Sequence, residues 1–130
     1  SDFKPSRQIK TMSKVEKFED LVVWQDAREL VSLVYKQFST SNDWAFKDQI
    51  QRASLSVMNN IAEGFERNSD KDFRRFLLIA KASCGEVRSM LYVALDLKYI
   101  NDSDGMKLKN QCLKISASLG SFIKYLEKSI

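Results

Sequence analysis

After Phe18, apolar residues recur at spacings of three and four along almost the whole sequence, which is the period of one face of an α-helix. The sharpest example begins at Phe46 and ends at Gly64, with successive spacings of 4, 3, 4, 4 and 3. Such a stripe is narrow, as the inner face of a helical bundle requires. Little interrupts these helices, because the chain has four glycines and one proline, which is Pro5. A β-sandwich or barrel needs more turn residues, so the sequence predicts an all-α protein.

Short polar segments divide this pattern into four helices. Asn42 or Asp43 can cap the second helix and Ser69 the third, because their side-chain oxygens accept hydrogen bonds from free backbone N–H groups. Four helices joined by short loops favour an antiparallel up-down-up-down four-helix bundle. The expected helices are 21–38, 43–64, 70–98 and a fourth that follows a turn at 101–105.

The length of 130 residues fits one folded domain. We divide the chain into a leader, residues 1–17, and a four-helix bundle domain, residues 18–130. The leader has five basic and two acidic residues, so it carries +3 of the net charge of +4. It is interpreted either as a basic arm that meets phosphate groups or, preferably, as a flexible solvated terminus.

The complete lack of histidine excludes several kinds of site within one chain. Histidine-dependent catalytic triads, zinc sites and di-iron sites all need it. We therefore expect no metal, no cofactor and no small-molecule substrate. Cys84 and Cys112 lack zinc-site spacing and are interpreted as core residues in a reducing compartment. No apolar run reaches the length of a membrane span, which favours a cytoplasmic protein without membrane contact.

The second and third helices carry more apolar residues than one stripe can hold. A helix in a monomeric bundle needs only one apolar stripe, and soluble monomers avoid large exposed apolar patches. We therefore predict an oligomer, the alternative being a wide seam within one chain. The predicted interface residues are Leu55, Met58, Phe65, Leu78 and Leu95.

Polar residues also recur at helical spacing on the second helix, where serine and asparagine are unfavourable unless they form hydrogen bonds. The helices fold back near residue 68, which predicts that Arg52 lies beside Glu86. The same register places Glu63 within reach of Lys71, Arg74 or Arg75. These contacts define an expected structural network of Arg52, Asn60, Glu63 and Glu86.

A catalytic interpretation of this network would make Glu63 and Glu86 an acid–base pair. No nucleophile, oxyanion hole or metal-ligand spacing accompanies them, so we expect no enzyme. Small residues near Gly85 instead predict that the second and third helices approach closely there.

The two C-terminal helices are basic, with eleven basic and seven acidic residues from position 70 onward. This surface can bind phosphate groups of a nucleic acid. A solvated face is the alternative, and composition alone favours it. The candidate nucleic-acid-binding residues are Lys71, Arg74, Arg75, Lys81 and Arg88.

Several short motifs between Phe18 and Leu126 resemble those of one known protein family. They are Phe18-x-x-Leu21-x-x-Trp24-Gln25-x-Ala27, Gln49-Ile50-Gln51-Arg52-Ala53, Asn60-Ile61-Ala62-Glu63-Gly64, Phe73-x-x-Phe76-Leu77-x-Ile79-Ala80, Ser83-x-x-Glu86 and Tyr99-Ile100. Together they resemble the bacterial four-helix-bundle family encoded in 23S ribosomal RNA intervening sequences. The accessory protein of diversity-generating retroelements is similar. The sequence departs from this family at Ser41–Ala45, where members commonly have a proline and a glutamate.

The resemblance implies a ring-shaped homo-oligomer, a homopentamer. In the retroelement relatives it further implies a basic ring that associates with a reverse transcriptase and nucleic acid. We therefore expect a non-enzymatic oligomer that binds RNA or a ribonucleoprotein partner through basic surfaces. The alternative is a structural scaffold or adaptor that binds another protein and makes no direct contact with nucleic acid.

Overall fold

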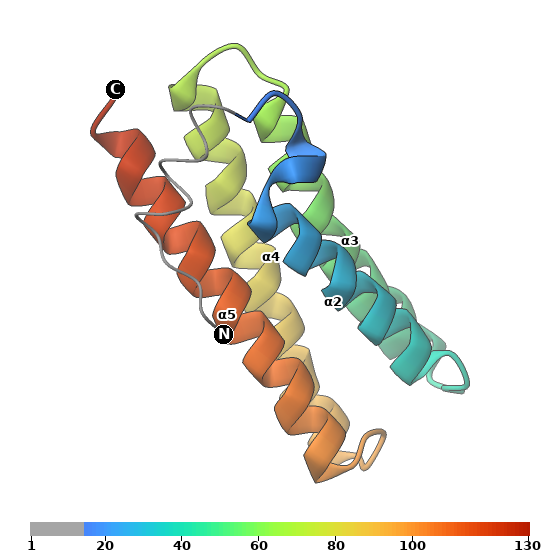
Figure 1. The fold of residues 1–130 in the computed structure, drawn as a ribbon. Helices are drawn as coiled ribbons and strands as arrows, with labels where there is room; N and C mark the ends of the chain where they lie inside the picture. The colour runs from blue at the N-terminus through green and yellow to red at the C-terminus, as the bar shows by residue number, and fades with distance from the viewer. Residues whose placement is uncertain (1–14) are drawn as a thin grey trace.

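The computed structural model describes residues 15–130, and all regular structure within them is helical. No strand occurs in this range, so the all-α class and the four helices are confirmed. Figure 1 shows each long helix turning back beside the one before it. The elements are a short 3-10 helix η1 (Phe18–Asp20), α2 (Val22–Phe38), α3 (Trp44–Phe65), α4 (Asp70–Asp96) and α5 (Asp102–Glu127).

Side-chain caps fix where three of these helices begin. Asp43 accepts a hydrogen bond from the Phe46 N–H at 3.1 Å, and Ser69 accepts one from the Asp72 N–H at 3.1 Å. Both caps were predicted. The structure corrects the start of α5, because Asn101 accepts from the Asp104 N–H at 2.7 Å. This cap begins the helix at Asp102, so most of the expected turn at 101–105 is helical.

The segment Ser41–Ala45, where the sequence departs from the family, is tied to the next loop at the same end of the bundle. The Tyr99 hydroxyl donates to Asp43 Oδ2 at 2.7 Å. This hydrogen bond and then the one from the Phe46 N–H lower the pKa of Asp43. The bond to Asp43 in turn raises the pKa of Tyr99. One aspartate thus caps α3 and joins the α2–α3 loop to the α4–α5 loop.

The predicted apolar stripes form one continuous core. Every apolar member of the stripe from Phe46 to Gly64 on α3 is buried. The apolar stripe of α4 is also buried and consists of Phe73, Phe76, Leu77, Ala80, Cys84, Val87, Leu91 and Ala94. Cys84 and Cys112 are free and buried, and the Cys84 thiol donates to the Cys112 carbonyl at 3.2 Å. Their interpretation as core residues is confirmed. The most extensive contacts join α3 to α4 and α4 to α5, whereas α2 has fewer contacts with its neighbours α3 and α5.

Two glycines mark close approaches, but neither is the one that the sequence predicted. A Cβ on Gly64 would lie 2.7 Å from the Phe76 Cβ, and one on Gly105 would lie 2.7 Å from a Leu95 methyl carbon. At Gly85 a Cβ would meet nothing within 4 Å. The two helices do approach closely nearby, since the Ser56 and Ser83 hydroxyls lie 2.7 Å apart. The expected part of Gly85 in this contact was wrong, because Gly85 lies on the exposed side of α4.

Within residues 15–130, none of the helices is both long enough and apolar enough to cross a membrane. The leader, residues 1–17, lies almost entirely outside the described residues, so its predicted division from the bundle stays a prediction.

Candidate nucleic-acid interface

The two halves of the helical body carry opposite net charges. Residues 18–69, which contain α2 and α3, have five basic and eight acidic residues. Residues 70–130, which contain α4 and α5, have eleven basic and seven acidic residues. Positive charge is therefore concentrated on the α4–α5 half, where a phosphate-binding surface would have to lie.

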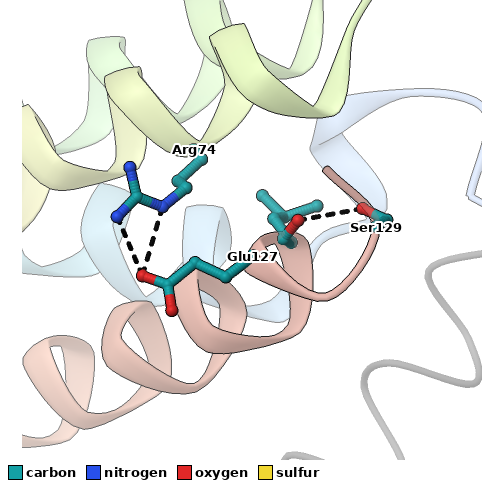
Figure 2. Close-up of polar contacts among 4 residues, drawn as sticks. Arg74, Glu127 and Ser129 are labelled. Carbon is teal, nitrogen blue, oxygen red and sulfur yellow. Dashed lines mark hydrogen bonds and ion pairs between the residues drawn. The ribbon is translucent and has the colours of Figure 1, made fainter.

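Arg74 begins a basic row on α4 but is already held by an acid. Its Nη2 and Nε lie 2.8 and 3.2 Å from Glu127 Oε1 on α5, as Figure 2 shows. Beside this pair, the Ser129 hydroxyl donates to Asp70 at 2.6 Å. These contacts fasten the end of α5 to the start of α4. They also compensate the charge of Arg74, which leaves it less available to an external phosphate.

Arg75 is only loosely paired, since its Nε lies 3.9 Å from Asp72 Oδ1. Its guanidinium carbon lies 4.6 Å from the centre of the Phe76 ring, and that of Arg67 lies 4.8 Å from the same ring. Cation–π contacts of this kind orient an arginine without neutralising it. Arg75 therefore keeps its charge at the surface.

The remaining three predicted basic residues are exposed. Lys71, Lys81 and Arg88 form no ion pair with any residue in the described range 15–130. Arg74, Lys81 and Arg88 are seven residues apart, so they follow one side of α4 at intervals of about two turns. This side borders α5, because Arg74 contacts Glu127 and Cys84 contacts Cys112. The structure thus aligns three of the five candidates in one row.

The polar network between α3 and α4 exists, but with different partners from those predicted. Gln49 Nε2 donates to Glu86 Oε2 at 3.1 Å, and the Ser56 and Ser83 hydroxyls lie 2.7 Å apart. Asn60 Nδ2 donates to the Ser56 carbonyl at 2.8 Å and to its hydroxyl at 3.0 Å. These bonds explain why serine and asparagine are tolerated inside α3.

The predicted pairing of Arg52 with Glu86 was wrong. Arg52 Nε instead lies 2.8 Å from Asp48 Oδ2, one turn earlier on the same helix. The predicted register correctly placed this part of α3 beside Glu86 on α4. Gln49 makes the contact instead of Arg52, because Arg52 points to the exposed side of α3.

The predicted contact of Glu63 with Lys71, Arg74 or Arg75 was also wrong, since Glu63 Oε1 lies 3.2 Å from Arg67 Nη2. The two glutamates of the catalytic alternative are not brought together either. Glu86 lies beside Gln49, and fourteen residues separate Gln49 from Glu63, about 21 Å along α3. Both glutamates are exposed.

Three of the five predicted interface residues cover this chain's own core. Met58, Phe65 and Leu95 are partly buried against it, which corrects the view that they form a spare apolar face. Leu55 is partly buried, and Leu78 is 41% exposed. The large apolar side chains that α4 exposes are Leu78, Ile79, Tyr92 and Val93, and Leu97 is exposed directly after its end.

Sequence reasoning did not single out Asp26, a buried acid between α2 and α5. Its Oδ1 lies 3.3 Å from Lys114 Nζ, whereas Oδ2 has no hydrogen-bond partner in the described part of the chain. Burial raises the pKa of Asp26, although Lys114 opposes the shift. An available signal was that Asp26 interrupts the apolar stripe of its helix between Val23 and Ala27.

The fold and this surface define a helical-bundle protein with one basic half. The family model described as the 23S rRNA-intervening sequence protein matches residues 19–121, and the chain belongs to this family.

A similar solved structure is a protein of unknown function from the S23 ribosomal protein family of Bacteroides thetaiotaomicron VPI-5482. The two chains are 26% identical and superpose with a TM-score of 0.75, over 79% of this chain and 99% of that one. No curated protein matches the sequence.

Proposed function

We propose that this protein is a non-enzymatic oligomer that binds RNA, or a ribonucleoprotein partner, through the basic half formed by α4 and α5. The supporting observation is the row on α4 in which Lys81 and Arg88 carry charges that no described residue pairs. Lys71 and Arg75 add further positive charge near the start of the same helix. Basic rows of this kind give affinity by releasing counterions from phosphates, largely without regard to sequence.

We further propose that the chains assemble as a ring-shaped homopentamer. The exposed apolar side chains of α4 support an interface, because a surface that includes Leu78, Ile79 and Val93 is better covered than left in water. Within each chain we propose the antiparallel up-down-up-down order. The contacts of Asp70 with Ser129 and of Arg74 with Glu127 support it, since residue numbers rise on α4 as they fall on α5.

An electrophoretic mobility-shift titration with a structured 23S ribosomal RNA fragment tests the RNA hypothesis. Binding is expected at low salt, with an affinity that falls steeply as salt is added. Charge reversal at Lys71 and Arg88 should weaken binding. Arg74 is a poor target, because its reversal would also break the contact with Glu127. A wild-type protein that gives no shift at low salt would contradict direct RNA binding.

The second candidate function is a scaffold that binds another protein. One specific observation favours it: Trp44, the first residue of α3, is 71% exposed and projects from the loop end of the bundle. Exposed tryptophans are frequent anchors in protein interfaces. A partner recovered by pull-down after nuclease treatment, and lost in Trp44→Ala, would favour the scaffold over the RNA-binding protein.

A further inference from the structure

A shallow hollow of about 470 Å³ opens to solvent on the seam between α4 and α5. Its floor on α5 is made of small residues in two successive turns, which leave the helix surface uncovered. Two lysines stand at its sides, one from each helix. The hollow is lined by Lys81, Ser116, Ala117, Gly120, Ser121 and Lys124, together with Leu113.

Gly120 shows how the lysine from α4 reaches this hollow. A Cβ at Gly120 would meet only the Lys81 Cε, at 3.7 Å. The aliphatic stem of Lys81 therefore lies over the bare backbone of α5, and its ammonium group stands at the seam rather than away from it. Long lysine stems commonly pack in this way while the charge stays in water.

The charges of the hollow are not compensated from within. No acidic residue lines it, and neither Lys81 nor Lys124 forms an ion pair with a residue in the part of the chain that the structure describes. A second hollow, of about 320 Å³, provides a contrast. It also has two lysines from different helices, Lys36 and Lys107, but Asp104 lines it with them.

We infer that the α4–α5 hollow binds one phosphate of an RNA backbone, with Lys81 and Lys124 supplying the positive charge. The hydroxyls of Ser116 and Ser121 can donate hydrogen bonds to the same phosphate oxygens. Arg88, two turns from Lys81 on the same side of α4, continues the basic row beyond the hollow. This inference rests on the proposed RNA binding and names where one phosphate is held.

The test measures binding of a short, labelled uridine oligonucleotide across a series of salt concentrations. The double variant K81Q/K124Q should lower the slope of log Kobs against log salt by about 0.7, the contribution of one neutralised phosphate of a single strand. The matched control K36Q/K107Q removes the same charge from the other hollow, where Asp104 already compensates it, and should change the slope less. A117L keeps both lysines but fills the floor, and it should weaken binding as well.

The outcomes separate the site from the proposed function. A wild-type protein that does not bind the oligonucleotide overturns both. Wild-type binding with an unchanged slope in K81Q/K124Q overturns the hollow and leaves RNA binding intact. Equal losses in the two double variants, or full binding by A117L, would show a diffuse charge effect and also overturn the hollow. Circular dichroism of each variant confirms that the helices are retained.

Discussion

At the scale of single residues, Asp26 is a carboxyl group whose surroundings are unfavourable to its charge. Asp26 is 8% exposed in the seam between α2 and α5, and one of its carboxylate oxygens has no hydrogen-bond partner among residues 15–130. The ionic groups that act on it are Lys114, which stabilises the carboxylate, and Glu29, which opposes it. Burial outweighs Lys114, so the net effect is a raised pKa and an ionised form that costs stability.

Asp26→Asn should therefore raise the free energy of unfolding at neutral pH. Because the native state holds the proton more tightly than the unfolded state, wild-type stability falls as pH rises from about 3.8 through the raised pKa. The advantage of the variant should shrink as pH is lowered through this window. Urea denaturation at several pH values measures it, with the exposed Asp20→Asn as control. A constant difference between wild type and Asp26→Asn at all pH values would refute the assignment.

Gly85 and Gly64 differ in the space beside their Cα atoms, so alanine should change the stability of the protein in opposite directions at the two positions. Gly85→Ala should stabilise the protein by about 0.5–1 kcal/mol, because alanine is the better helix former and meets no obstacle there. Gly64→Ala should destabilise it by about 1–3 kcal/mol, since its Cβ would be forced against Phe76 and Phe73. Thermal and urea unfolding of the two variants measure both signs. Stabilisation by Gly64→Ala would contradict the close approach of α3 and α4.

At the scale of helices, the sequence predicts positions along an axis better than directions around it. The apolar stripes and the caps at Asp43 and Ser69 follow from local rules and were predicted correctly. The direction of Arg52 depends on how α3 is rotated against α4, which no local rule sets. The same limit explains Met58 and Leu95, since the width of the seam is decided by how the other helices surround it.

The basic residues illustrate the same division. The sequence shows that positive charge is concentrated after residue 70, but it does not show which basic residues are paired with an acid. Glu127 is 53 positions from Arg74, and only the fold shows that it compensates this arginine. The Lys81–Lys124 hollow likewise needs two helices in register, so a search along the chain cannot find it.

The side-chain cap of Ser69 stabilises the start of α4, and its contribution can be measured. Ser69→Ala removes the acceptor for the Asp72 N–H at the start of α4 and should cost about 1 kcal/mol of stability. Ser89→Ala, in the exposed middle of the same helix, is the matched control and should be neutral or slightly stabilising. Equal effects of the two substitutions on urea unfolding would show that the cap contributes nothing.

At the scale of the whole molecule, the exposed apolar side of α4 bears on assembly. The wild-type mass in solution should be five times the 15.0 kDa of one chain if the pentamer is correct. Val93→Asp should lower this mass without unfolding the bundle, because Val93 is 44% exposed and an aspartate there would be buried in the interface. Light scattering coupled to size-exclusion chromatography measures the mass.

Val22→Asp is the control for this assembly prediction, since Val22 is similarly exposed but lies in the first turn of α2. An acidic residue is favourable in that turn, so the assembly should persist. A wild-type protein with the mass of one chain would contradict the oligomer. If Val93→Asp has the same mass as the wild type, this side of α4 is excluded from the interface.

Because α2 has fewer contacts than the other helices, we expect it to be locally less stable than α3, α4 and α5. The other three helices contact one another along two extensive seams, whereas α2 has fewer contacts with its neighbours. It also carries two buried polar atoms, Asp26 Oδ2 and Trp24 Nε1, that have no hydrogen-bond partner among residues 15–130. Partial unfolding begins where the fewest contacts must be broken. Amide hydrogens of α2 should therefore exchange with deuterium before those of α4, through openings in which α2 detaches while α3, α4 and α5 stay together.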